Sequence, residues 1–183
     1  IFRVPNANTT QTVTFSGSLF NTGIVNKTIN KGTITAPFVG TNATITQFDD
    51  NNNLVGNPFP SAIDSQAFIA TNNSVLEDGS VSLWRHLTAI ATATSPYYQT
   101  FVYNYVGTDY VKHNGTASLP AGAFDGKIAS GQAFFVKMKE SLGATANLEF
   151  RNEHRSRNHN NSQFFRTTDP FTSSKPKIER NRI

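Results

Sequence analysis

The sequence predicts an all-β fold, an antiparallel, jelly-roll-like β-sandwich with one short helix. Short runs in which apolar and polar residues alternate recur along most of the chain, as they do in half-buried strands. Gly, Asn and Pro residues separate these runs and predict turns. Together they indicate about eight to ten short strands, a pattern typical of sandwiches.

The opening part of the chain supplies the first strands. Val13 and Phe15 share one face of their run, and Val25 and Ile29 share one face of theirs. Turns of the hairpin type are predicted at residues 21–23 and 30–32, because Asn and Gly tolerate positive φ. The strands predicted here cover residues 12–16, 25–29, 33–35 and 44–46.

A proline-rich segment follows a polar turn predicted at residues 49–53. Pro58 and Pro60 have no backbone N–H, so residues 56–60 are not expected to form a central strand. Phe59 lies between the two prolines, and we expect it to be buried against the sandwich.

The one helix is predicted directly after this segment. Asp64 is expected to accept backbone N–H groups as the N-cap of a helix over residues 65–70. Phe68 and Ile69 would then face the body of the domain, and residues 72–74 would end the helix.

The second half of the chain carries the most apolar strands. The only tryptophan, Trp84, lies in the first of them. The run at 101–106 has apolar residues on both faces and is predicted as a central strand. The strands predicted here cover residues 81–86, 101–106, 133–138 and 148–150.

Composition excludes several classes of chemistry. The chain has no cysteine, which excludes disulfides, thiolate catalysis and Cys-based zinc sites. It has no apolar run of about 18 residues, so no membrane insertion is expected.

The charges are unevenly distributed along the chain. Residues 1–150 carry eight Lys/Arg and nine Asp/Glu, whereas residues 151–183 carry eight Lys/Arg and three Asp/Glu. A basic tail can bind nucleic acid or acidic polymers, but a solvated connector is the simpler interpretation. We therefore expect a sandwich module over 1–166, a basic linker over 167–183 to a downstream module, and no nucleic acid as partner.

Asp49, Asn51 and Asn53 offer oxygen atoms at alternating positions, as a calcium loop does. However, Leu54 follows where a calcium loop of the EF-hand type has Gly, and no Glu closes the loop. We interpret the run as a polar turn and predict no metal and no cofactor. A calcium site that also uses Asp78 and Asp109 is the alternative left open.

No motif indicates catalysis. The chain lacks the Gly-x-Ser-x-Gly nucleophile motif and the glycine-rich loops that bind phosphate or dinucleotides. Its four histidines lack the spacing of a helical zinc site; they are His86, His113, His154 and His159. The sequence therefore predicts that the protein is not an enzyme.

Aromatic residues are the candidates for ligand binding. Tyr97 and Tyr98 follow Pro96 in a predicted loop, where exposed rings could stack on a sugar. Trp84 and Tyr103 lie in predicted strands and are interpreted as core residues. Tyr110 is a further aromatic residue among those considered for stacking on a sugar.

Residues 53–64 (Asn-Leu-Val-Gly-Asn-Pro-Phe-Pro-Ser-Ala-Ile-Asp) and 128–136 (Ile-Ala-Ser-Gly-Gln-Ala-Phe-Phe-Val) carry a resemblance. They resemble a β-rich module of large surface and secreted proteins from Bacteroidetes such as Flavobacterium. The family commonly has Tyr where this chain has Phe59 and Gly where it has Ala133. The residues that form this structural signature are Gly56, Asn57, Pro58, Phe59, Pro60, Asp64, Gly131, Phe134 and Phe135.

The resemblance implies export by the type IX secretion system and a place outside the cell or on its outer surface, in a gliding or polymer-degrading bacterium. It implies a non-catalytic structural or adhesion module. A carbohydrate-binding module attached to a secreted polysaccharide hydrolase is the alternative. The implied partners are neighbouring domains of the same polypeptide, the secretion machinery and surface polysaccharide.

Overall fold

The computed structural model of the chain describes residues 23–39, 44–84, 109–157 and 159. These residues form an all-β fold in which every strand pairing is antiparallel. The helix α1 (Ser65–Asn72) is the one α-helix of the described part. The predicted antiparallel, sandwich-like fold with one short helix is therefore confirmed. No helix among the described residues is long and apolar enough to cross a bilayer.

A five-stranded sheet forms the larger layer. Its order is β4 (Asn52–Gly56), β10 (Ala133–Met138), β6 (Leu76–Trp84), β7 (Tyr110–His113) and β8 (Ser118–Leu119). In β10 the side chains of Phe134, Val136 and Met138 are buried in the core, whereas Phe135 and Lys137 alternate with them on the opposite face. This sheet therefore has an inner face on the core and an outer face.

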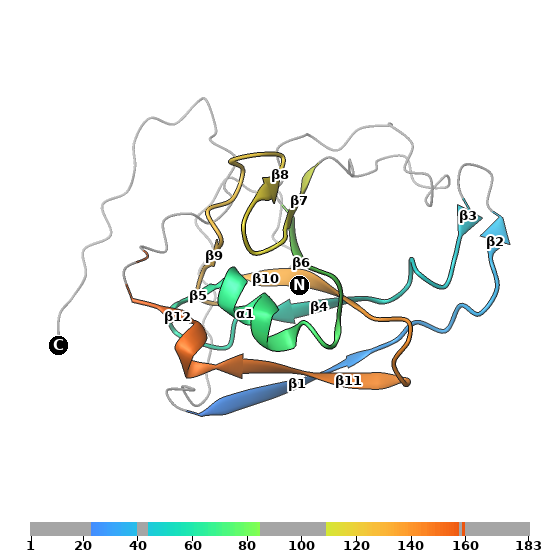
Figure 1. Cartoon of the computed structure of the whole chain (residues 1–183), viewed down its shortest axis with the longest axis horizontal. Coiled ribbons are helices and arrows are strands. Elements are labelled where there is room, and N and C mark those ends of the chain that lie inside the picture. The colour runs from blue at the N-terminus through green and yellow to red at the C-terminus, as the bar shows by residue number, and fades with distance from the viewer. Residues whose placement is uncertain (1–22, 40–43, 85–108, 158, 160–183) are drawn as a thin grey trace, which may run out of the picture.

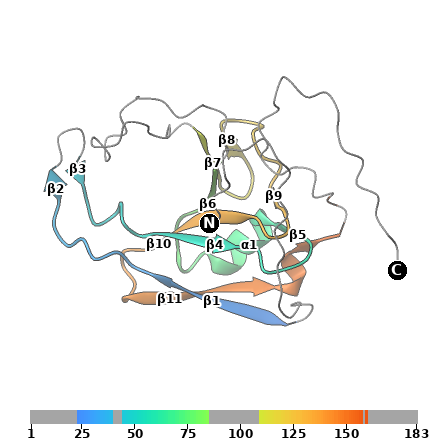
Figure 2. The same ribbon diagram turned by 180° about the vertical axis from the view of Figure 1, so that it is seen from behind.

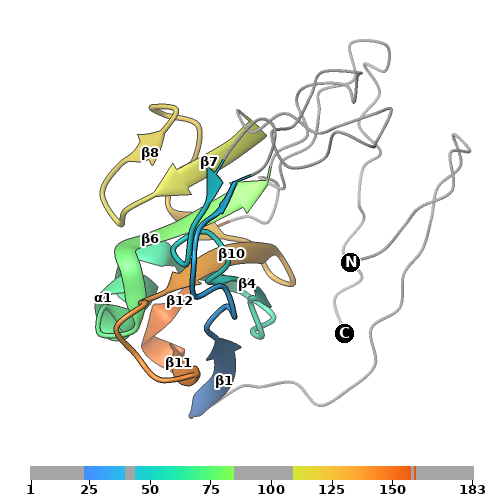
Figure 3. The same ribbon diagram turned by 90° about the vertical axis from the view of Figure 1, so that its right-hand side faces the viewer.

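The second layer is a two-stranded ribbon of β1 (Ile24–Asn30) and β11 (Thr145–Arg151). Figure 3 shows the ribbon below the stacked strands β6, β10 and β4. Ile29, Leu148 and Phe150 bury their side chains in the core from this layer. The core is therefore enclosed between the ribbon and the inner face of the larger sheet.

Helix α1 closes the core beside the two layers (Figure 1). Asp64 is its N-cap, and its side chain accepts hydrogen bonds from the N–H groups of Gln66 and Ala67, as predicted. The buried ring of Phe68 lies 5.4 Å from Phe134 and 4.9 Å from Phe150, measured between centroids. Because Phe134 belongs to one layer and Phe150 to the other, Phe68 joins both.

Two smaller sheets lie at opposite ends of the molecule (Figure 2). One contains β12 (Arg155–Ser156), β5 (Ala62–Asp64) and β9 (Lys127–Ile128), in that order. The other pairs β2 (Phe38–Val39) with β3 (Thr44–Ile45). A 3-10 helix, η2 (Asn152–His154), connects β11 to β12.

The predictions for residues 30–35 are wrong. β1 does not turn back into a hairpin at residues 30–32 but pairs with β11, with Asn30 opposite Thr145. Residues 33–35 form no strand, because the N–H of Ile34 donates to Asp50 Oδ2 at 2.8 Å instead of to a neighbouring strand. A side-chain acceptor thus replaces the expected strand partner.

Other boundaries also differ from prediction. The turn predicted at 49–53 ends earlier, since Asn52 already belongs to β4. β6 begins at Leu76 and includes a register irregularity at which Asp78 and Gly79 have positive φ. The helix continues to Asn72, two residues beyond the prediction. The strands predicted at 12–16 and 101–106 and the linker at 167–183 lie outside the described residues.

Candidate functional site

The two segments that carry the resemblance are joined by the side chain of Asn57. Its Nδ2 lies within hydrogen-bonding distance of the carbonyl oxygens of Ser61 (2.8 Å), Ile128 (3.2 Å) and Ala129 (3.0 Å). Its Oδ1 accepts the N–H of Phe59 at 3.0 Å. Asn57 is only 5% exposed, so this network is part of the interior.

The other signature residues also belong to the framework. Phe59 is 1% exposed, and its carbonyl accepts the hydroxyl of Ser130 at 3.0 Å. Gly131 has a φ of 69°, a left-handed conformation that favours glycine, in the turn before β10. Gly56 ends β4, and Pro58 and Pro60 flank Phe59 in the following bend. The prediction that Phe59 is buried is confirmed.

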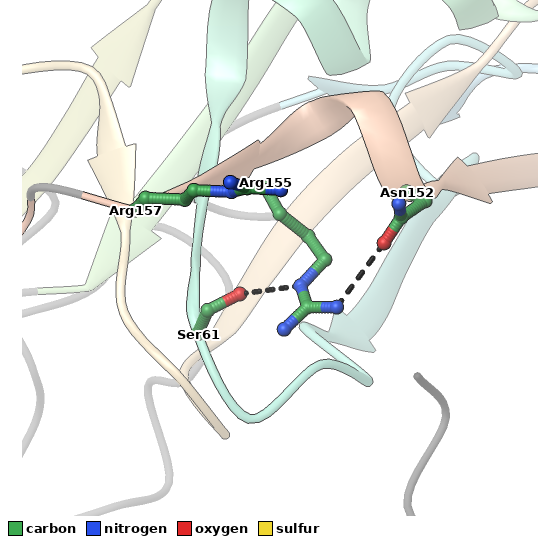
Figure 4. Close-up of a pocket in the computed structure, with 4 residues that line it drawn as sticks. All are labelled: Ser61, Asn152, Arg155 and Arg157. Carbon is green, nitrogen blue, oxygen red and sulfur yellow. Dashed lines mark hydrogen bonds between the residues drawn. The ribbon is translucent and has the colours of Figure 1, made fainter. Parts of the chain in front are cut away.

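A pocket of about 260 Å³ lies next to this framework and is lined by Ser61, Asn152, Arg155 and Arg157 (Figure 4). Arg155 donates from Nε to Ser61 Oγ at 2.9 Å and from Nη1 to Asn152 Oδ1 at 3.1 Å. Its guanidinium carbon lies 5.7 Å from the centroid of the Phe59 ring. This contact is a cation–π interaction, so Arg155 also covers the buried signature residue.

The chemistry of this pocket favours an anion. Arg155 and Arg157 bring two permanent positive charges, and the described lining residues include no carboxylate. Guanidinium groups bind carboxylate or phosphate oxygens through paired hydrogen bonds. Arg155 already donates hydrogen bonds to Ser61 and Asn152, so its guanidinium also holds these two residues in place.

A row of aromatic rings crosses the outer face of the five-stranded sheet. The rings of Trp84 and Tyr110 meet edge to face with 4.8 Å between centroids, and Tyr110 lies 5.7 Å from Phe135. Tyr110 is 39% exposed. The interpretation of Trp84 as a core residue is wrong, because it lies opposite Tyr110 on this outer face and is only partly buried.

A polar hollow of about 170 Å³ adjoins Phe135 on the same face. Phe48, which is 47% exposed, supplies a second aromatic ring to its lining. The neutral hydrogen-bonding side chains of the lining are Asn52, Ser80 and Ser82. The charged ones are Asp49, Asp78, Lys112 and Lys137. The hollow therefore combines apolar rings with both donors and acceptors.

The charges of the hollow balance one another. Asp78 Oδ2 accepts from Lys112 Nζ at 2.9 Å, and this hydrogen bond lowers the pKa of Asp78 despite some desolvation. The hydrogen bonds from the N–H and hydroxyl of Thr46 lower the pKa of Asp49. Both carboxylates are thus ionised at neutral pH, and with Lys112 and Lys137 the described lining has no net charge.

Two of the four histidines, His113 and His154, are buried and belong to the framework. His113 Nδ1 lies 3.0 Å from Ser65 Oγ and accepts the N–H of Gly115 at 3.1 Å. His154 Nδ1 accepts the N–H of Arg151 at 3.2 Å, and its Nε2 lies 2.8 Å from Thr71 Oγ1. Burial lowers the pKa of both rings. They therefore remain neutral near pH 7.

The polar run at 49–53 is tied into the fold through hydrogen bonds. Asn51 Oδ1 accepts the N–H of Gly32 at 2.8 Å, and its Nδ2 donates to Glu140 at 2.8 Å. Asp50 Oδ1 is buried and has no hydrogen-bond partner among the described residues. Within the described ranges no three acidic or histidine side chains gather as metal ligands would. The absence of calcium stays a prediction.

The structure describes neither Tyr97 and Tyr98 nor His86, so the predicted sugar-binding pair lies outside the described residues. The hollow next to Phe135 was not predicted as a site. The alternation of Phe134 and Phe135 in one strand was the available signal, since it places one of the two rings on each face. No local pattern links Phe135 to Phe48 or Lys112.

The family comparison covers the entire chain. A family model described as a domain of unknown function, DUF8693, matches residues 1–183. No curated protein and no solved structure matches the chain. The chain therefore belongs to the DUF8693 family.

Proposed function

We propose that the chain is a non-catalytic structural or adhesion module of a secreted or cell-surface bacterial protein exported by the type IX secretion machinery. The observation that carries the proposal is the joint made by Asn57, which connects both signature segments through buried hydrogen bonds. A signature whose residues hold the framework together is what a module used as a scaffold requires.

A further buried asparagine, Asn72, supports the same interpretation. Asn72 donates to the carbonyls of Phe68 and Glu149, and it accepts the N–H of Glu149 at 2.8 Å. It thus locks the end of α1 to β11. These polar groups fix one arrangement of the layers instead of facing a cavity, which suits a module that presents a surface or bears load.

The proposed partners are the neighbouring domains of the same polypeptide, the export machinery and surface polysaccharide. The proposed location is extracellular or on the outer cell surface.

An experiment on intact cells tests this function. Antibodies raised against the 183-residue chain should label the surface of the bacterium that encodes it, and the label should disappear when type IX secretion is disabled. Replacing the module in its parent gene with an unrelated sandwich of similar size then separates the two roles. Restored attachment indicates a structural spacer, and lost attachment indicates an adhesion module. Labelling confined to permeabilised cells would contradict the proposal.

A carbohydrate-binding module attached to a secreted hydrolase is the second candidate. The aromatic row of Trp84, Tyr110 and Phe135 favours it, because sugars stack on accessible rings and Tyr110 is 39% exposed. A hydrolase domain in the same open reading frame would support this candidate. An array of repeated β-modules there would support the first.

A further inference from the structure

We propose that the hollow on the outer face of the five-stranded sheet binds a neutral saccharide unit, with Phe48 and Phe135 as its apolar walls and Asp78 and Lys112 as its hydrogen-bonding pair. This inference rests on the adhesion role proposed above and gives it a site. Of the described residues that line the hollow, Phe135 and Val136 belong to a signature segment, and the others lie outside both segments.

The mixture of groups in the hollow matches the surface of a sugar ring. A saccharide has apolar C–H faces, which pack on aromatic rings, and hydroxyls at its edges, which both donate and accept. Phe48 and Phe135 supply the rings. Asn52, Ser82 and the Asp78–Lys112 pair supply acceptors and donors around them.

The charge balance selects a neutral ligand. Asp49 and Asp78 oppose Lys112 and Lys137 in the described lining, so an acidic or basic ligand gains no net attraction there. The arginine-lined pocket next to Phe59 has the opposite character, because its described lining is cationic. The two hollows are therefore expected to differ in the charge of what they bind.

The backbone at Asp78 gives an independent reason to assign a role to this side chain. Asp78 has a φ of 60°, and it is the one non-glycine residue with positive φ in the described part of the chain. It lies at the register irregularity of β6, and such irregularities redirect side chains next to binding sites. The ion pair it forms with Lys112 is about half exposed, so its contribution to stability is small.

The small size of the hollow limits the expected affinity. With a volume of about 170 Å³ it holds one small ring rather than a drug-sized ligand. We expect a dissociation constant of about 1 mM for a neutral oligosaccharide. Repeated modules on a surface would raise such weak binding through avidity.

Affinity electrophoresis of the full chain tests the proposal. Native gels would contain a neutral polysaccharide (mannan, xyloglucan or mixed-linkage glucan) or an acidic one (alginate or pectate). Retardation is expected in at least one neutral gel. Phe48→Ala and Asp78→Asn should each weaken binding by about tenfold or more. The first removes an aromatic wall, and the second replaces one acceptor oxygen and the negative charge by an amide NH2. Asparagine tolerates the backbone conformation at position 78.

Matched controls separate binding from folding. Phe38→Ala removes a ring that is 63% exposed on β2, and Lys27→Gln removes an exposed charge on β1; neither residue lines the hollow, so both should bind as the parent does. All variants should keep the parent melting temperature within a few degrees.

The proposal is overturned by the absence of retardation in every neutral gel. It is also overturned by binding that survives both hollow variants, or by retardation in the acidic gels alone. Surface labelling of cells is independent of these results, so the proposed function can hold when this inference fails.

Discussion

The side-chain amide of Asn57 donates to the carbonyl of Ala129 across 72 positions of the sequence, with 3.0 Å between the two atoms. The same amide also reaches Ile128, and the N–H of Asn57 donates to Gln132 at 3.0 Å. One residue thus fixes the bend after β4 against the turn before β10. The two sequence segments that make up the signature are one structural unit.

We expect Asn57→Ala to lower the free energy of unfolding by about 3 kcal/mol. The substitution leaves the buried N–H of Phe59 and the carbonyls it faced without their partner, and each unsatisfied group costs about 1–3 kcal/mol. Urea denaturation measures the change. Asn26→Ala, at an exposed position of β1, is the control and should change stability by less than about 0.5 kcal/mol. Equal effects of the two substitutions would remove the structural role assigned to Asn57.

Phe59→Ala should lower the free energy of unfolding by about 3–5 kcal/mol, because it removes a ring that is 1% exposed. It also removes the surface over which Arg155 lies. Thermal and urea denaturation measure the change. The control is Phe38→Ala, whose ring is 63% exposed and whose loss should leave stability nearly unchanged. An unaltered melting temperature in Phe59→Ala would contradict its role in the core.

Local signals explain which elements the sequence predicted well. The alternation around Phe134 placed β10, and the Asp64 cap placed the start of α1, since both signals lie within a few residues of the element they define. Phe59 was predicted to be buried for the same reason, from its position between two prolines.

Pairings between distant segments could not be predicted from such signals. β1 alternates as expected, but its partner β11 begins more than one hundred positions later, and nothing in residues 24–30 specifies it. The hollow likewise combines Phe48 with Lys112 and Phe135. A pattern within one strand shows which face a residue lies on, but not which residues from other strands lie beside it.

Gly32→Ala should destabilise the protein by about 1–3 kcal/mol through overpacking. An alanine Cβ at this position would overlap the carboxylate of Asp50, which in turn holds the N–H of Ile34. Gly143→Ala is a matched control, because its Cβ would meet nothing within 4 Å and its φ is not positive. The difference between the two unfolding free energies is the measurement. A Gly32→Ala protein as stable as the control would mean that Asp50 moves aside at little cost.

Chelation should leave the melting temperature unchanged. Asp49 Oδ2 accepts from the N–H and hydroxyl of Thr46, and Asp50 Oδ2 accepts from the N–H of Ile34, so one oxygen of each carboxylate in the 49–53 run already has a partner within the protein. Asp50 Oδ1 has none among the described residues, but no cluster of three acidic or histidine side chains surrounds it there. Differential scanning fluorimetry with EDTA, and then with excess calcium, measures this. A bound ion stabilises the folded state by about 2.7 kcal/mol at one hundred times its dissociation constant. A large fall in melting temperature with EDTA that calcium reverses would show a calcium site.

Acidification below about pH 6.5 should destabilise the protein through His154 and His113. Burial lowers the pKa of both rings in the folded state, so the unfolded chain, with an ordinary value of 6.5, takes up protons first. The stabilisation is therefore complete above about pH 6.5 and is lost as the pH falls from there towards the folded-state pKa values. Urea denaturation at about pH 7.5 and about pH 5.5, above the titration of most carboxylates, measures the slope. His154→Gln should reduce that slope, whereas the control Lys27→Gln, at an exposed position of β1, should leave it as it is. A slope that is unchanged in His154→Gln would show that the buried ring of His154 is not a source of the pH dependence.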